Sequence, residues 1–169
     1  MDNVISDVME YEPSPIDLVE SLAELRSWDV DRLCEDQIAM AVEGAWKTYS
    51  LSLAWCEPDE TLRMVCTFDL NVPDDRLARM YEAIEAANDR IWLGGFNLWR
   101  EQGLMAFRYG LNLSGSAAST SEQVDAMLKA AVKNCERFYP TFHLISCDER
   151  ETSVEAAMAT ALLEAAGSA

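Results

Sequence analysis

The stretch YSLSLAWC, residues 49–56, shows the clearest strand pattern of the chain. Large apolar side chains occupy one set of alternating positions and small side chains the other, as in a strand with one buried face. After the turn-forming residues EPDE (57–60), the stretch LRMVCTFDL (62–70) again places large apolar side chains at every second position. Because a short turn separates the two stretches, we expect them to be antiparallel neighbours in one sheet.

Further strands are predicted on both sides of this pair. Residues 28–34 and 37–43 precede it and are separated by a short turn, so the four stretches together predict a meander. Residues 96–101 and 104–113 follow it as a hairpin, because Gln102-Gly103 between them is suited to a tight turn.

Helical patterns flank the predicted strands. Ser14 and Pro15 suit the N-cap and the first position of a helix whose apolar residues recur three and four positions apart. The predicted helices begin at Pro15, at Pro73 and at Thr120 or Ser121; the second ends at Gly94-Gly95, Pro140 should end or kink the third, and the last covers 153–166. These patterns predict an α+β protein with a single antiparallel sheet, built from a strand meander plus a hairpin and flanked by helices on its faces.

The composition fits one compact domain. The 169 residues are 50% apolar and 25% charged, near the average for globular proteins. We interpret residues 1–13 as a flexible acidic arm and residues 14–166 as the single domain. There are 13 Lys and Arg against 30 Asp and Glu, a formal net charge of −17. Such a surface repels phosphate backbones and anionic lipids, so neither nucleic acid nor a membrane is expected as a partner.

The sequence favours a cytoplasmic location. Residues 1–11 lack the basic start and apolar run of a secretory signal, and no stretch approaches the roughly 18 uninterrupted apolar residues of a membrane span. The five cysteines are irregularly spaced and form no CxxC pair, which argues against a disulfide framework and against a zinc site. Free thiols in a reducing compartment are expected instead.

No motif for catalysis is found. His143 is the only histidine, and Cys135, eight residues before it, lacks a recognisable third group that would orient a nucleophile–base pair. Adjacent acidic residues occur where turns or helix starts are predicted, and acids are common there for structural reasons. We therefore expect no catalytic residues, no bound cofactor and no metal, and we do not predict an enzyme.

The five tryptophans are many for this length. Trp55 belongs to the large-residue face of its strand and is assigned to the core. Trp92 and Trp99 flank the Gly94-Gly95 turn, and Trp99 either meets a helix or lines an open sheet face. Aromatic side chains are enriched at recognition surfaces. The candidate interaction surface consists of Trp92, Phe96, Trp99 and Tyr109.

Three segments resemble the YbjN-type proteins of bacteria. They are VPDDRLARMYEAIEAANDRIWLGGFNLWREQGLMAFRYGLNL (72–113), CERFYPTFHLI (135–145) and SPIDLVESLAELRSWDVDRL (14–33). The resemblance covers roughly residues 14–165 and depends on the order of the segments, not on a catalytic signature. It implies a regulator of sensory transduction with a fold similar to type III secretion chaperones, which are small, acidic, usually dimeric proteins that bind segments of partner polypeptides.

The leading interpretation is a non-enzymatic cytoplasmic protein-interaction domain, chaperone-like or a regulatory adaptor, that binds an unidentified partner polypeptide. The resemblance and the surplus of aromatics also predict a homodimer, with helix 73–92 and strand 96–101 near its twofold axis. The alternative is a small-molecule-binding protein or enzyme whose pocket combines carboxylates with Trp99 or Tyr109. A third possibility is mimicry of nucleic acid by the acidic surface, which an even scatter of charge would oppose.

Overall fold

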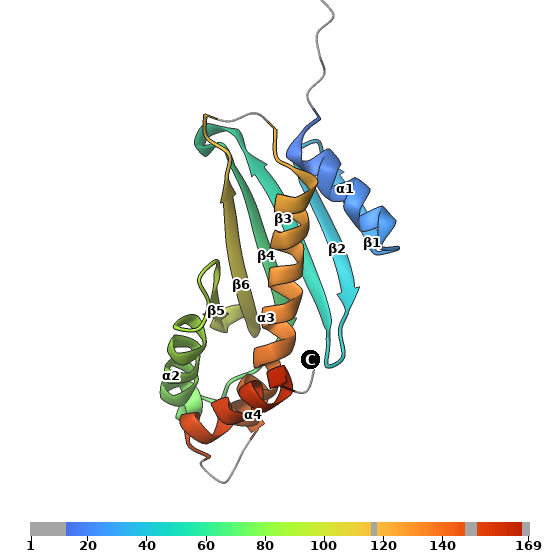
Figure 1. Cartoon of the computed structure of the whole chain (residues 1–169). Coiled ribbons are helices and arrows are strands. Elements are labelled where there is room, and N and C mark those ends of the chain that lie inside the picture. Colours follow the sequence, from blue (N-terminus) through green and yellow to red (C-terminus); the bar gives the residue numbers. More distant parts are fainter. Residues whose placement is uncertain (1–12, 116–117, 148–151, 167–169) are drawn as a thin grey trace, which may run out of the picture.

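The computed structural model describes residues 13–115, 118–147 and 152–166, and it confirms the predicted α+β class (Figure 1). The predicted arm falls outside these residues except for Pro13. The strands form one antiparallel sheet in the order β1-β2-β3-β4-β6-β5. Its strands are β1 (Asp29–Cys34), β2 (Gln37–Glu43), β3 (Thr48–Cys56), β4 (Thr61–Asp69), β5 (Gly95–Trp99) and β6 (Leu104–Asn112). The helices are α1 (Pro15–Leu25), α2 (Leu77–Asn88), α3 (Ser121–Cys147) and α4 (Val154–Ala166).

The described helices cover one face of the sheet and one of its ends. In Figure 1, α1 and α3 lie across the same face, while α2 and α4 lie together beyond the lower end of the sheet. Alternate residues of the strands accordingly point into the core under α1 and α3, as the buried Leu51, Leu53 and Met64 do. The sequence analysis placed helices on the faces of the sheet and left open whether Trp99 meets a helix; in the described residues the opposite face of the sheet has no helix on it.

The first helix begins as the sequence predicted. The side chain of Ser14 accepts the backbone N–H of Ile16, and the Asp17 carboxylate accepts the backbone N–H of Ser14, which together form a capping box. The guanidinium of Arg32 on β1 then pairs with Asp17 and with Glu20, at 3.0 and 2.7 Å, and ties α1 to the sheet edge.

Of the two outcomes expected at Pro140, an end or a kink of the helix, the end does not occur, because α3 continues to Cys147. Proline removes one N–H and crowds the preceding turn, at a cost of about 3 kcal/mol. Buried side chains on both sides of Pro140 offset this cost, because Phe138, Phe142 and Ile145 all belong to the core. Tertiary burial therefore keeps the helix intact where local chemistry would end it.

Two other predicted boundaries are shorter in the structure. The helix expected over 73–92 begins at Leu77, after the short 3-10 turn Asp74–Arg76, and ends at Asn88. The strand expected over 96–101 ends at Trp99, because Arg100–Gln102 form a 3-10 turn before Gly103, whose φ of 65° is left-handed.

A polar contact closes the core where the β2–β3 turn meets α3. Tyr49 is fully buried, and its hydroxyl donates a hydrogen bond of 2.6 Å to the Glu136 carboxylate. The second oxygen of that carboxylate accepts the backbone N–H of Ala45 at 3.1 Å. Gly44 is required beside it, because a Cβ there would lie 2.1 Å from the Glu136 carboxylate. This contact fixes the β2–β3 turn against α3.

Candidate interaction surfaces

The four residues that the sequence proposed as one interaction surface lie in different environments. Trp92 is 99% exposed, whereas Phe96 is 1% exposed and packs against Phe138 and Phe142 in the core. Phe96 therefore cannot contact a partner, which corrects that part of the prediction. Strand alternation places Trp99, half-buried, on the open face of the sheet and Tyr109, half-buried, on the helix-covered face.

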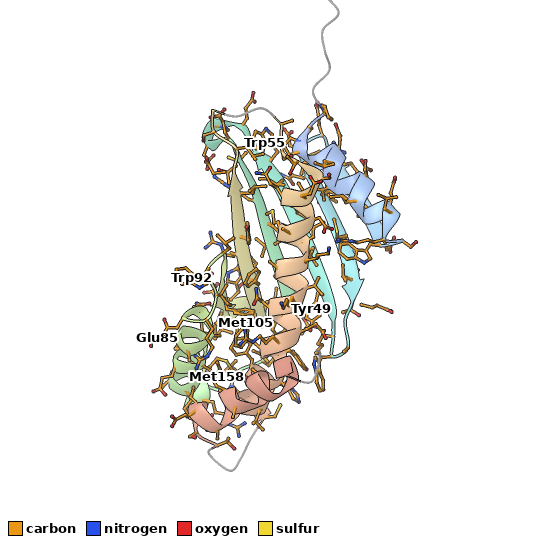
Figure 2. All side chains as sticks on the ribbon, in the orientation of Figure 1. Tyr49, Trp55, Glu85, Trp92, Met105 and Met158 are labelled. Carbon is orange, nitrogen blue, oxygen red and sulfur yellow. The ribbon has the colours of Figure 1, made fainter. Side chains whose placement is uncertain are left out.

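Trp92 belongs instead to a set of exposed residues in the segment from α2 to β5, Tyr81, Trp92 and Leu93, which we call the aromatic corner. Tyr81, within α2, is 51% exposed, and Leu93, after its end, is 62% exposed, so three large side chains of this segment face water. Figure 2 shows Trp92 pointing away from the body of the molecule, on the same side as Glu85 of α2. Large apolar groups at such exposure are unusual in a monomeric protein and mark interaction sites when they gather.

The aromatic corner lies directly before β5, which is an edge strand of the sheet. The side-chain amide of Asn88 caps part of that edge: it accepts the backbone N–H of Phe96 at 2.7 Å and donates to the Phe96 carbonyl at 3.1 Å. An amide in this position replaces the peptide group of a further strand and blocks uncontrolled strand pairing. Only a short part of the β5 edge, at Leu98, stays open beyond it.

The open face of the sheet is a second free surface. Residues that pair across neighbouring strands form rows on this face. One row, from β1 to β5, consists of Asp31, Ala39, Ser52, Val65, Arg108 and Gly95. The middle of the face carries small side chains such as Ser50, Ser52 and Ala54. Acids stand at the β1 side, and Arg63 and Arg108 stand at the other side. The face is therefore flat in the middle and carries opposite charges at its two sides.

Two shallow hollows lie on this face. One, of about 280 Å³, is bordered by Asp29 and Asp31 above β1–β3, and the other, of about 460 Å³, is bordered by Arg63, Arg108 and Asn97 above β4–β6–β5. A third hollow, of about 570 Å³, lies at the opposite end of the molecule from α2, beside Trp55. Carboxylates of Glu35, Asp36, Glu57 and Glu60 border it.

The only histidine does not build a catalytic pair with Cys135. Cys135 is fully buried, and its sulfur lies 3.6 Å from that of Cys66 on β4. The hydrogen bond with Cys66 and the burial both raise the pKa of the Cys135 thiol, so it stays protonated. His143 instead stacks on Tyr139, with its Nδ1 3.7 Å from the sulfur of Cys147. Within the described residues, no three His, Cys, Asp or Glu side chains are grouped to hold a metal.

Comparison with known proteins agrees with the resemblance seen in the sequence. Residues 15–144 match the YbjN family, described as "Putative bacterial sensory transduction regulator", and the chain belongs to that family. The fold is similar to the crystal structure of E. coli YbjN, titled "a putative transcription regulator", with a TM-score of 0.51 and 9% identity over 72% of this chain and 85% of that one. No curated protein matches the sequence. The family description names a regulator, not an enzyme.

None of the described helices is both long and apolar enough to cross a membrane. The sequence-based choice of interaction residues found Trp92 but missed its neighbours. Tyr81 and Leu93 carry no motif of their own, and the exposed position of Leu93 follows from the early end of α2 at Asn88. Arg108 was likewise unmarked, because its strand position shows its significance only once the sheet order is known.

Proposed function

We propose that the chain is a non-enzymatic regulatory domain that binds a partner polypeptide through the aromatic corner. The observation that carries this proposal is Trp92, whose side chain is almost fully exposed beside a strand edge. Aromatic residues that stand in water contribute most of the binding free energy once a partner covers them. Membership of a family described as regulatory supports a role in recognition rather than in catalysis.

The surroundings of the aromatic corner suggest how the partner is selected. Glu82, Glu85 and Asp89 are exposed in the same segment as the apolar residues, together with one exposed arginine, Arg90. An apolar centre with an acidic rim fits a partner segment that carries apolar side chains flanked by basic ones. Because the rim charges act through water, they change the association rate and its salt dependence more than the final affinity.

The proposal is tested by capture from the native cytosol. The immobilised full-length chain is compared with Trp92→Ser and with the control Leu25→Ser, which removes another strongly exposed apolar side chain, 82% exposed, from α1. We expect the same proteins to be lost with Trp92→Ser and kept with Leu25→Ser, and their direct binding to weaken by about 2 kcal/mol or more. Equal capture by all three chains would show that the aromatic corner is not the binding surface.

The homodimer is a further part of the proposal. The sequence placed its axis at helix 73–92 and strand 96–101, but Phe96 is buried and Asn88 caps the β5 edge there. We therefore assign the aromatic corner to the partner polypeptide and look for the self-association surface elsewhere. Light scattering checks the oligomeric state: a mass near the chain mass of 18.9 kDa at every concentration would exclude the dimer.

The hollow at Trp55 supports a second candidate function, the binding of a small organic cation. Trp55 is half-buried and shares the hollow with the carboxylates of Glu57 and Glu60, and an aromatic ring with carboxylates is the usual environment for a quaternary ammonium group. Of the two aromatic residues considered from sequence, Tyr109 borders the hollow with Arg63 and Arg108, whose lining includes no carboxylate. Calorimetric titration with tetramethylammonium tests it: binding that Trp55→Leu abolishes supports this function, and the absence of heat refutes it.

A further inference from the structure

Arg108 differs from the other arginines, because its charge has no partner among residues 13–115, 118–147 and 152–166. Every other arginine in the described ranges forms an ion pair, a hydrogen bond or a ring contact; these are Arg26, Arg32, Arg63, Arg76, Arg79, Arg90, Arg100 and Arg137. Arg108 forms none of these and stands exposed on the open face. Asp31, exposed in the same row of the sheet, also has no partner among the described residues.

The register places these two charges symmetrically about β3. In the order β1-β2-β3-β4-β6, Asp31 is on the first strand, Ser52 on the third and Arg108 on the fifth, and all three belong to one row. Two copies whose open faces meet can be related by a twofold axis that runs parallel to β3, midway between the two sheets. This rotation places the first strand of one copy opposite the fifth strand of the other, and the second opposite the fourth. Asp31 of one copy then faces Arg108 of the other, and Ser52 faces its own copy.

The neighbouring rows obey the same symmetry. Gln37 on β2 and Arg63 on β4 share a row with Ala54 on β3, so Gln37 of one copy faces Arg63 of the other across the axis. The acidic hollow at Asp29 and Asp31 faces the hollow that contains Arg63 and Arg108. The row through Thr48 is the exception: Glu43 on β2 faces Asp69 on β4 of the other copy, so like charges meet at that end of the interface and lower its affinity.

We infer that the open face binds a second copy of this chain, sheet against sheet. The small side chains along β3, Ser50, Ser52 and Ala54, let the two sheets approach to the usual distance of about 10 Å. Packed sheets are rotated by about 30°, which offsets the outer strands by roughly 5 Å. The length of an arginine side chain spans such an offset, so Arg108 reaches Asp31 of the other copy.

The area is sufficient for a moderate dimer. Five strands about 4.8 Å apart, with seven to nine residues each for β2–β4 and β6, give a footprint of roughly 500 Å² per copy. The total of about 1,000 Å² lies at the lower limit for specific interfaces. We therefore expect a dimer that dissociates in the micromolar range. β5 lies beyond the exchanged strands, so the aromatic corners of both copies stay accessible.

This inference rests on the proposed role as an interaction domain, and charge reversal tests it separately. Asp31→Arg and Arg108→Asp each place like charges together twice in the dimer, and together in one chain they restore opposite charges. We expect each single variant to weaken dimerisation about tenfold or more, and the double variant to return to within about threefold of the wild type. Glu24→Arg and Lys133→Asp, exposed on the helices, make the same charge changes as controls.

Sedimentation velocity across the micromolar range gives the dissociation constants, and circular dichroism checks that each variant folds. Ser52→Glu, an exposed change on β3, should also separate the copies by placing two carboxylates at the axis. A wild type of 18.9 kDa at all concentrations would overturn the inference, as would single variants that dimerise normally. A loss of partner capture in Arg108→Asp without any loss of dimerisation would also overturn the inference, because it would place the partner polypeptide on this face. A loss of capture in Trp92→Ser with normal dimerisation would support the inference, because the two surfaces would then be separate.

Discussion

The contact between Tyr49 and Glu136 allows a quantitative prediction about stability. Tyr49→Phe keeps the ring in its fully buried site but removes the hydrogen bond to Glu136. The carboxylate keeps the backbone N–H of Ala45 and is only partly buried, so water can replace the lost donor in part. A hydrogen bond to a charged group contributes about 1.5–3 kcal/mol, and because water replaces part of the lost bond we expect a somewhat smaller loss of about 1–2 kcal/mol near neutral pH. For a domain of this size the melting temperature should fall by about 3–6 °C.

The same contact makes the effect depend on pH. Burial first, and then the hydrogen bond and charge of Glu136, raise the pKa of Tyr49 well above its ordinary value. The folded chain holds this proton more tightly than the unfolded chain does. The stabilisation is therefore complete below the unfolded pKa, about 10, and is lost as the pH rises above it, by up to about 1.4 kcal/mol per pH unit. Phenylalanine cannot ionise, so Tyr49→Phe does not have this alkaline loss.

Urea unfolding followed by tryptophan fluorescence, near neutral pH and at about pH 11, measures both effects. The deficit of Tyr49→Phe should shrink or reverse at the higher pH. Raised pKa values of Cys135 and Tyr139 act on both chains alike and cancel in the difference. Tyr81→Phe, at an exposed position, is the control and should match the wild type at both pH values. A deficit of the same size at both pH values would refute the assignment of the shifted pKa to Tyr49.

Three further changes have defined outcomes. Trp92→Ala should leave the free energy of unfolding within about 0.5 kcal/mol of the wild type, because almost none of the ring is buried. Trp99→Ala, at a half-buried position, should cost about 1.5–3 kcal/mol of stability; thermal unfolding and partner capture on the same variant then separate any binding role, about 1–3 kcal/mol, from unfolding. Gly44→Ala should cost about 1–3 kcal/mol in urea unfolding, because its Cβ would collide with Glu136, and a neutral result would contradict the tight packing described there.

Much of the sheet could be predicted because a buried strand face leaves a period of two in the sequence. The alternation over residues 49–56 and 62–70 corresponds to β3 and β4, with the large side chains inside. The extent of α3 could not be predicted at Pro140, because the buried neighbours that keep the helix intact belong to tertiary packing.

The candidate surfaces were less predictable for a physical reason. Trp92, Phe96 and Trp99 are close in sequence, yet the end of α2 at Asn88 and the pleat of β5 send them to water, to the core and to the open face. Aromatic content alone therefore indicates that a surface exists but does not say which ring belongs to it. The position of Asp31 and Arg108 in one row of the sheet could not be predicted from the sequence, because it follows only from the strand order.

The distribution of positive charge connects the two proposed surfaces. In a chain of net charge −17, basic side chains are scarce, and most arginines of the described residues hold elements together, as Arg32 holds α1 and Arg26 bonds Asp125 of α3. Arg108 has no such contact among the described residues and lies on the face that their helices leave uncovered, which is most simply explained by a contact outside the chain. The segment of the aromatic corner, in contrast, exposes three acids, Glu82, Glu85 and Asp89, against one arginine, Arg90, so its net charge disfavours another acidic copy. This distribution of charge supports both proposals, a second copy on the open face and a partner of opposite charge at the aromatic corner.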